Sequence, residues 1–324
     1  MQIRRFALAI LPLLVAMGGP PTARSEPWPQ RPVRIIVPFG AGGSSDVAAR
    51  ILAQQLGAAF GQQVVVENRP GASGVLAAEA VARAPADGYT LLMATTAQIS
   101  VTPQITQTPY DPIKDFAPIS VVATNPFVLA VHPSIPARTV GEFVAFARAQ
   151  PHRLAYASSG IGSIGHLSME LFLRRAGLEM IPVTSKGGTA QLNDVIAGRV
   201  KVTLLNLSVV APFAASDALR LLAVTSEKRS PQIPDVPIFS ESGLPGFKIL
   251  NWVSLMAPAG TDKEIIDRIA AEVSRAVKDP KVSAILVANG LEPVGDSPAE
   301  FAAMIAADIP LWTEAVKQAG LKAK

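Results

Sequence analysis

The chain has 324 residues, of which 49% are hydrophobic and 17% are charged, and it contains no cysteine. Disulfides and a cysteine-linked lipid anchor are therefore excluded, and a chain of this length must be stabilised by hydrophobic cores, with room for two domains. The formal net charge is +4, no basic run is longer than two residues, and the tyrosines and tryptophans are scattered. This pattern argues against nucleic-acid binding and against a polybasic membrane patch.

The N-terminus has the pattern of a secretory signal peptide. Arg4 and Arg5 form a basic start, Phe6–Met17 is apolar, and Ala23-Arg24-Ser25 is an A-x-S cleavage site. The apolar run is shorter than the roughly 18 residues that span a membrane. We therefore expect residues 1–25 to be removed on export. The three arginines leave with this segment, so 26 of the 29 basic residues remain against 25 acidic ones, and the mature chain is nearly neutral.

Short β-rich runs alternate with helical patterns along the mature chain. In its first third, apolar spacing predicts the strands Val33–Val37, Val64–Val66 and Thr90–Ala94 and the helices Asp46–Phe60 and Gly74–Arg83. This βαβαβ order favours a parallel sheet with right-handed crossovers. Two further strands are expected at Phe116–Ala123 and Phe127–Val131, with a break at Asn125-Pro126.

The same βαβαβ order recurs in the middle of the chain. The expected elements there are a helix at Val140–Ala149, the strands Leu154–Ala157, Met180–Val183 and Val202–Leu205, and the helices His166–Arg175 and Ala190–Ala197. A strand at Leu219–Val224 follows. Helices at Lys263–Lys278 and Pro298–Ala319 end the chain, and Pro310 favours a kink in the last one.

Each βαβαβ half begins with a strand that runs through glycines and serines into a helix. A helix start leaves backbone N–H groups unpaired at its positive end, which makes an anion site. Two such loops, far apart in sequence, predict two half-sites that close on one anionic ligand. The expected ligand-binding residues are Phe39, Gly40, Ala41, Gly42, Gly43, Ser44 and Ser45 in the first loop, and Ser158, Ser159, Gly160, Gly162 and Ser163 in the second. We expect Asp46 to cap its own helix rather than to contact the anion.

Five further residues are candidates for the same site. Thr95 and Thr96 end the third strand of the first half and Asn206 follows the third strand of the second half, where open α/β sheets bind ligands. His166 lies at a helix start and is either a ligand donor or a structural residue. Lys186 is either a charged rim residue or a cation that pairs with a ligand carboxylate.

Other chemistries lack their required residues. Gly160, Gly162 and Gly165 fit the dinucleotide spacing G-x-G-x-x-G, but the end of the next strand carries Thr184-Ser185-Lys186 instead of an acid that would bind a ribose. The sequence has no G-x-S-x-G nucleophile elbow, no metal-ligand spacing and only three histidines. We therefore expect no catalytic centre, no cofactor and no metal, and keep an exported hydrolase as the weaker alternative.

Several blocks, taken in order, resemble the substrate-binding proteins of tripartite tricarboxylate transporters, the Bug-type periplasmic receptors. They include Trp28–Phe39 (WPQRPVRIIVPF), Val64–Gly71 (VVVENRPG), Ala86–Leu92 (ADGYTLL), Leu222–Pro237 (LAVTSEKRSPQIPDVP) and Met256–Thr261 (MAPAGT). Each block alone is a weak indication, whereas their number and order along essentially the whole mature chain make the resemblance specific.

The resemblance implies an α/β, two-domain type II periplasmic-binding-protein (Venus-flytrap) fold, each domain a mainly parallel sheet flanked by helices. It implies a first domain of residues 26–124 plus 226–324 and an inserted second domain of residues 125–225. The glycine loops would then grip a small carboxylate, which is delivered unchanged to membrane transporter subunits. A ligand sensor that signals to a partner is an alternative with the same fold. No feature indicates an oligomer, so we expect a monomer.

Two positions depart from the family pattern. Ser185 stands where the family usually has tyrosine, and Leu205-Asn206 stands where it often has an Asp-Asn pair. Without that acid, the ammonium group of an amino acid would lack its partner. The sequence therefore favours a carboxylate ligand that has no amino group, with space for an apolar body.

Overall fold

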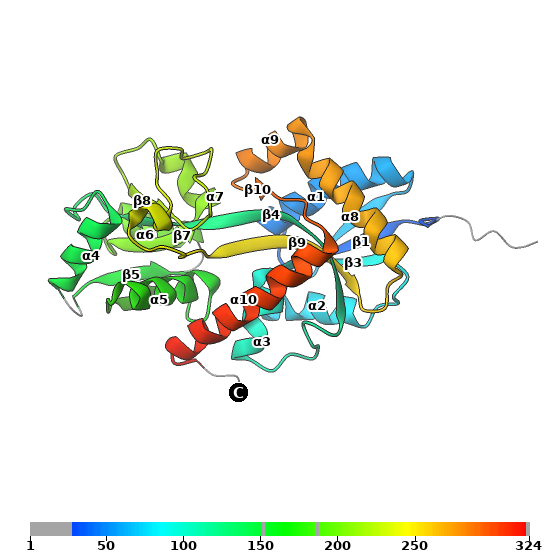
Figure 1. Ribbon diagram of the computed structural model, residues 1–324, viewed down its shortest axis with the longest axis horizontal. Coiled ribbons are helices and arrows are strands. Elements are labelled where there is room, and N and C mark those ends of the chain that lie inside the picture. Colours follow the sequence, from blue (N-terminus) through cyan, green and yellow to red (C-terminus); the bar gives the residue numbers. More distant parts are fainter. Residues whose placement is uncertain (1–27, 151–152, 186–187, 322–324) are drawn as a thin grey trace, which may run out of the picture.

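The computed structural model describes residues 28–150, 153–185 and 188–321. The predicted signal peptide and Lys186 lie outside these residues. Two β-sheets flanked by helices form two lobes, and the long strand β4 (Phe116–Val131) passes from one sheet into the other (Figure 1). We call the lobe that contains the N-terminal strands the first lobe and the other one the second lobe.

The sheet of the first lobe has the strand order β2-β1-β3-β9-β4. Its strands are β1 (Val33–Val37), β2 (Val64–Asn68), β3 (Thr90–Thr95), β9 (Leu250–Pro258) and the start of β4, with the short β10 (Glu292–Pro293) beside β4. β1 pairs in parallel with β2 and β3, as the βαβαβ pattern predicts. The pairs β3–β9, β4–β9 and β4–β10 are antiparallel.

Helices cover both faces of this sheet, which explains why its strands are apolar almost throughout. Ile35 packs in a core with α1 (Ser44–Phe60), α8 (Lys263–Lys278) and α9 (Pro280–Ala288). The next residue, Ile36, points to the other face and packs with α2 (Val75–Ala82) and α10 (Pro298–Gln318). The alternation of one strand therefore supplies two cores.

The second lobe repeats the plan with the strand order β4-β7-β5-β6 and with β8 also paired to β4. Its elements are the strands β5 (Ala155–Ser158), β6 (Ile181–Thr184), β7 (Val202–Asn206) and β8 (Arg220–Val224) and the helices α4 (Val140–Arg148), α5 (Ile164–Ala176), α6 (Gly188–Ile196) and α7 (Leu207–Val210). β5 pairs in parallel with β6 and β7, whereas β4 pairs antiparallel with β7 and β8. Both sheets are thus mixed: each βαβαβ unit is parallel, and the strands at the crossing are antiparallel.

The expected break at Asn125-Pro126 is wrong, because β4 runs through it as one strand. Pro126 is the last residue that pairs with β9, and Phe127 is the first that pairs with β7. The proline therefore marks the change of partner strand, where its missing N–H breaks no ladder bond. The N–H of Phe127 donates to the Thr225 hydroxyl at 2.9 Å, so the crossing remains hydrogen-bonded.

The return to the first lobe lies further along the chain than residue 225. Phe239, Phe247 and Ile249 pack in the core of the second lobe with Phe172, and pairing with the first sheet resumes at Leu250. The long connection after β8 thus belongs by its packing to the second lobe. We propose that the inserted lobe comprises residues 127–249 instead of 125–225.

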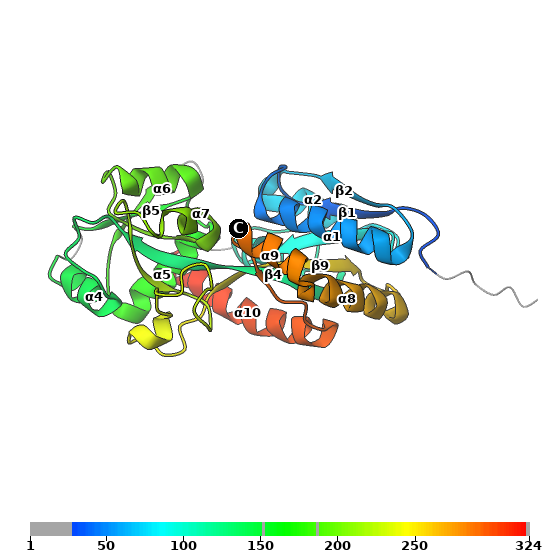
Figure 2. The same cartoon turned by 90° about the horizontal axis from the view of Figure 1, so that it is seen from above.

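The C-terminal helix α10 lies along both lobes (Figure 2). Phe301 and Ile305 in its first half pack in the first lobe. Trp312 and Val316 in its second half pack in the core of the second lobe. No helix in the described part of the chain has the length and apolar content needed to cross a membrane.

Candidate functional site

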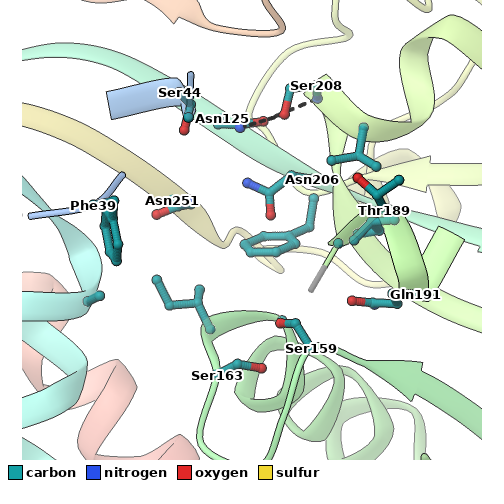
Figure 3. A pocket seen from close by; sticks show the side chains of 18 of the residues that line it. Phe39, Ser44, Asn125, Ser159, Ser163, Thr189, Gln191, Asn206, Ser208 and Asn251 are labelled. Carbon is teal, nitrogen blue, oxygen red and sulfur yellow. Dashed lines mark hydrogen bonds between the residues drawn. The ribbon is translucent and has the colours of Figure 1, made fainter. Parts of the chain in front are cut away.

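A cleft of about 710 Å³ lies between the lobes and is lined by residues of both (Figure 3). The carboxyl ends of β1 and β5 lead into the two glycine loops on opposite sides of it. Eight of the predicted site residues line the cleft: Phe39, Gly42, Gly43, Ser44, Ser159, Gly162, Ser163 and Asn206. The structure thus brings together residues from both predicted half-sites, and their role in ligand binding stays a prediction.

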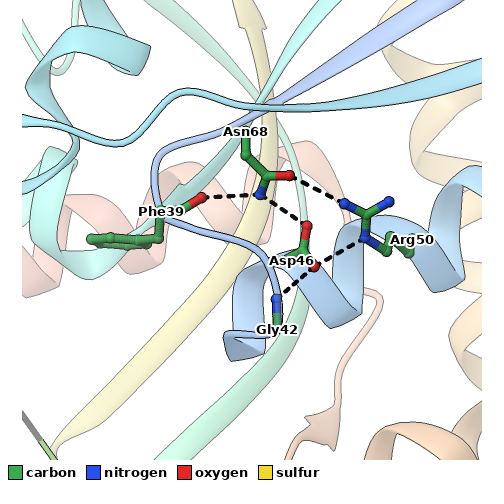
Figure 4. A network of polar contacts seen from close by, with 5 residues as sticks. All are labelled: Phe39, Gly42, Asp46, Arg50 and Asn68. Atoms are coloured by element: carbon green, nitrogen blue, oxygen red, sulfur yellow. Dashed lines mark hydrogen bonds and ion pairs between the residues drawn. The ribbon is translucent and has the colours of Figure 1, made fainter.

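A polar network around the buried carboxylate of Asp46 shapes the first glycine loop (Figure 4). The Asp46 carboxylate accepts hydrogen bonds from the N–H of Gly42 at 2.9 Å, from Nε of Arg50 at 3.0 Å and from Nδ2 of Asn68 at 2.9 Å. Asn68 Nδ2 also donates to the carbonyl of Phe39 at 3.0 Å. Burial would raise the pKa of Asp46, but the hydrogen bonds from Arg50, Gly42 and Asn68 outweigh it and lower that pKa. Asp46 is therefore an ionised brace beneath the loop and does not line the cleft. The expectation that it caps its own helix is wrong, because Gly43 is the N-cap and no side chain caps α1.

The second loop has the same construction with a histidine as the brace. The N–H of Gly162 donates to Nδ1 of His166 at 3.3 Å, four residues ahead, as that of Gly42 donates to Asp46. His166 is 3% exposed and its ring stacks on Tyr156. Burial lowers the pKa of His166, so the ring is neutral near pH 7 and Nδ1 can accept. This geometry favours the structural alternative for His166, which does not line the cleft.

The helix starts behind both loops keep donors free for a ligand. No side chain caps α1, so the backbone N–H groups of its first turn have no partner within the helix. In α5 the Ser163 hydroxyl accepts from the N–H of His166 at 3.2 Å, which leaves the N–H groups of the two preceding helical residues. The partial positive charges of both helix ends therefore face the shared cleft, an arrangement that suits an anion.

Thr95 and Thr96 were expected at the crevice, and the structure corrects this. β3 continues into a buried π-helix, η2 (Ala97–Val101), instead of ending at an open loop. The Thr95 hydroxyl donates to Oε1 of Gln98 at 2.8 Å, and the Thr96 hydroxyl accepts from the N–H of Trp252 at 3.0 Å. These threonines therefore fasten β3 to η2 and to β9.

The remaining predicted residues lie behind the lining or at the loop tips. Ser45 and Ser158 are buried beneath their loops, and the Ser158 hydroxyl accepts from the N–H of Gly160 at 3.4 Å. Gly40 and Ala41 are exposed at the tip of the first loop. None of these five residues lines the cleft.

The structure adds lining residues that the sequence patterns did not indicate. In the first lobe they are Ser73, Ala97, Val101, Thr102 and Asn289; at the crossing Asn125, Phe127 and Asn251; in the second lobe Thr189, Gln191 and Ser208. Asn125 and Asn251 face each other across the β4–β9 ladder. In the sequence, each is an asparagine within a mainly apolar run, and this polar exception could have indicated a site residue.

The cleft is polar but uncharged over the described residues. No Asp, Glu, Lys, Arg or His side chain of the described chain lines it. Asn206 projects toward its centre (Figure 3). Phe39, Phe127 and Leu205 are apolar residues of the lining. Ser185, in place of the family tyrosine, is buried and does not line the cleft, and its hydroxyl donates to the Asp194 carboxylate at 2.5 Å. The described residues also contain no cluster of three metal-ligating side chains.

Two lobes joined by crossing strands, with helix starts from both facing one cleft, define a two-lobed binding protein of the Venus-flytrap class. The family model of the tripartite tricarboxylate transporter family receptor (TctC) matches residues 48–321. Protein BugT of Bordetella pertussis is 35% identical over 323 residues, which cover 98% of each chain. The chain therefore belongs to the TctC receptor family, as the sequence blocks predicted.

Solved structures of relatives have the same fold. R. palustris Rpa4515 with adipate superposes with a TM-score of 0.78 at 37% identity, covering 92% of this chain and 100% of that one. MatC (Rpa3494) from Rhodopseudomonas palustris with bound malate superposes with a TM-score of 0.73 at 29% identity, covering 89% and 100%. This places the chain among solute-binding receptors with the periplasmic-binding-protein fold.

Proposed function

We propose that the protein is a periplasmic receptor that closes its lobes on one small carboxylate and delivers it to the membrane subunits of a tripartite transporter. The observation that carries the proposal is the pair of helix N-termini, one from each lobe, that face one cleft, in which the described residues place no charged side chain. A carboxylate bound there is held by backbone N–H groups, hydroxyls and amides. The adipate and malate complexes of Rpa4515 and MatC support this class of ligand.

The lining also supports a ligand without an amino group. An ammonium group needs an acceptor with negative charge, and no acid among the described lining residues supplies it. Leu205 replaces the acid that the family often has, and together with Phe39 and Phe127 it forms apolar walls. We therefore propose a mono- or dicarboxylate with an aliphatic or aromatic body, in preference to an amino acid.

Binding without turnover fits the same lining. General acid–base or nucleophilic catalysis needs titratable groups that reach the ligand. His166 does not line the cleft, and its Nδ1 accepts a hydrogen bond from the N–H of Gly162. We propose that the ligand leaves unchanged, and NMR of the ligand recovered after incubation with the protein tests this.

A thermal-shift screen of refolded residues 26–324 tests the proposal. The panel contains mono-, di- and tricarboxylates, aromatic acids and amino acids, and refolding removes ligand retained from the cell. A ligand at 100 times its dissociation constant adds about 2.7 kcal/mol of stability, which raises the melting temperature by a few degrees. We expect one class of acids without amino groups to produce this shift.

Gly43 allows a charge test of the same site. Its φ is −77° and the nearest atom to an added Cβ is 3.8 Å away, so a side chain fits there without strain. Gly43→Asp places a carboxylate at the start of α1, and Gly43→Asn is the isosteric neutral control. We expect Gly43→Asp to abolish the shift and Gly43→Asn to retain part of it. Equal shifts in both variants would contradict an anion site at this loop.

A further inference from the structure

The segment that follows β2 has an unusual backbone. Gly71, Ala72, Ser73 and Gly74 are four consecutive residues with positive φ, at 142°, 48°, 55° and 90°. Ala72 and Ser73 are the two non-glycine residues in this region of φ in the described part of the chain. Such a conformation costs free energy for a residue with a Cβ, and it persists only where the surroundings impose it.

The buried side chain of Gln98 holds the segment in this conformation. Its side chain is fully buried in η2, and Nε2 donates to the carbonyl of Ser73 at 2.9 Å. Oε1 accepts from the N–H and the hydroxyl of Thr95, at 2.9 and 2.8 Å, which fixes the orientation of the amide. A Cβ at Gly74 would lie 2.3 Å from Nε2, so only glycine allows this close approach.

The strained segment presents Ser73 to the cleft. Ser73 lines the cleft and is exposed, whereas Gly74 packs beneath it against Pro38, the residue before Phe39 of the first glycine loop. Within the described residues, the Ser73 hydroxyl has no hydrogen-bond partner, although its carbonyl is held by Gln98. The fold thus maintains two unfavourable backbone conformations and leaves a hydroxyl free at the site.

We infer that Gly71–Gly74 is a third ligand-contacting loop beside the two glycine loops, with Ser73 as the contact and Gln98 as its positioning residue. This inference rests on the proposed function. The Ser73 hydroxyl donates to an oxygen of the bound carboxylate, and Gln98 acts only through Ser73. The strain is retained because relaxing the loop would move this hydroxyl out of the cleft.

Isothermal titration of refolded residues 26–324 with adipate and with malate, together with the melting temperature, tests the contact. Ser73→Ala removes the hydroxyl and keeps the strain, so we expect affinity for the bound probe to fall about five- to tenfold, the effect of one hydrogen bond. Ser73→Gly removes both, so affinity falls equally and the melting temperature rises. The matched control is Ser216→Ala, which removes an exposed hydroxyl that lies outside the cleft lining and outside the Gly71–Gly74 loop. It leaves affinity unchanged.

A double-mutant cycle tests Gln98. Gln98→Met weakens binding about as much as Ser73→Ala, and adds little in the Ser73→Ala background, because the positioned group is already absent. If Gln98→Met does not fold, Gln98→Glu replaces it, since it keeps the acceptor for Thr95 and loses the donor to Ser73. Additive losses of affinity in the cycle would overturn the positioning role.

The outcomes separate this inference from the proposed function. If the wild-type chain binds a probe and both Ser73 variants bind it equally well, the third loop is overturned and the receptor function stands. If the wild-type chain binds neither probe nor any acid of the thermal-shift panel, the receptor function fails and the inference fails with it.

Discussion

At the scale of single residues, both loops depend on an acceptor placed four residues after a glycine of positive φ. Gly42 has a φ of 85° and bonds Asp46, and Gly162 has a φ of 79° and bonds His166. In each case the acceptor pairs with the N–H of a loop glycine, and the N–H groups at the start of the following helix remain available to the proposed ligand. One brace is an ionised acid and the other a neutral imidazole, so the two loops respond differently to pH.

His166 makes stability depend on pH in a defined direction. Burial lowers its pKa from the ordinary 6.5, so below about pH 6.5 the unfolded chain binds a proton that the folded chain does not. His166 therefore favours folding less as the pH falls from 7 toward its folded pKa. We expect the ligand-free protein to lose stability on this descent relative to His166→Asn, whose amide oxygen can accept from Gly162 without titrating. Urea unfolding of both proteins at pH 7.5, 6.5 and 5.5 measures the difference, and parallel pH profiles would contradict it.

At the scale of elements, the sequence patterns predicted the strands and helices whose ends are marked by turn residues such as glycine and proline. Val33–Val37 and Lys263–Lys278 have the predicted bounds, and the glycine loops lie where the strand–glycine–helix pattern placed them. The pattern missed β9, since Asn251 and Trp252 lie in an apolar run without alternation, and it divided β4 at Pro126. These two errors fall on the crossing between the lobes, where pairing with distant strands overrides local preference. The pattern also missed the helix α9, which begins directly after α8.

The same reason limits what the sequence could say of the site. The residues before the two helix starts could be predicted because they are local. Asn251, Ser73 and Asn289 reach the cleft only through tertiary packing. Thr95 and Thr96 were misplaced because the rule that ligands bind beyond strand ends does not foresee a buried π-helix at that end.

At the scale of the whole molecule, the two lobes contact each other beside the cleft where Gly290 packs against Ser208. A Cβ at Gly290 in the first lobe would lie 2.2 Å from Cα of Ser208 at the start of α7 in the second lobe. Ser208 is also fastened to Asn125 on β4, whose Nδ2 donates to the Ser208 hydroxyl at 2.9 Å. Gly290 therefore sets how closely α7 approaches the first lobe.

Gly290→Ala should hinder this approach. The added methyl displaces the Ser208 backbone, so we expect affinity for the carboxylate to fall about tenfold or more and the lobes to separate. Gly61→Ala is the control, because Gly61 has a similar φ of 65° and nothing within 4 Å of an added Cβ. It should lose stability through backbone strain and keep its affinity. Titration and small-angle scattering with saturating ligand compare the two variants, and equal affinity in both would contradict the role of Gly290.

The helix α10 adds a second connection between the lobes besides the crossing strands. It packs in both lobes, and Glu314 pairs with Arg174 of α5 at 2.7 Å (Figures 1 and 2). Closure on a ligand must therefore occur about an axis that keeps α10 in contact with both lobes. On the side of the cleft, the two lobes face each other through the glycine loops.

Isothermal titration of refolded residues 26–324 with adipate, malate, aspartate and glutamate tests the central claim most directly, because it measures affinity and stoichiometry for acids with and without an amino group. Because no acid lies among the described lining residues, we expect an acid without an amino group to bind with a stoichiometry of one per chain, and aspartate and glutamate to bind far more weakly. Tight binding of aspartate or glutamate alone, with the other acids silent, would contradict a cleft built for carboxylates without amino groups.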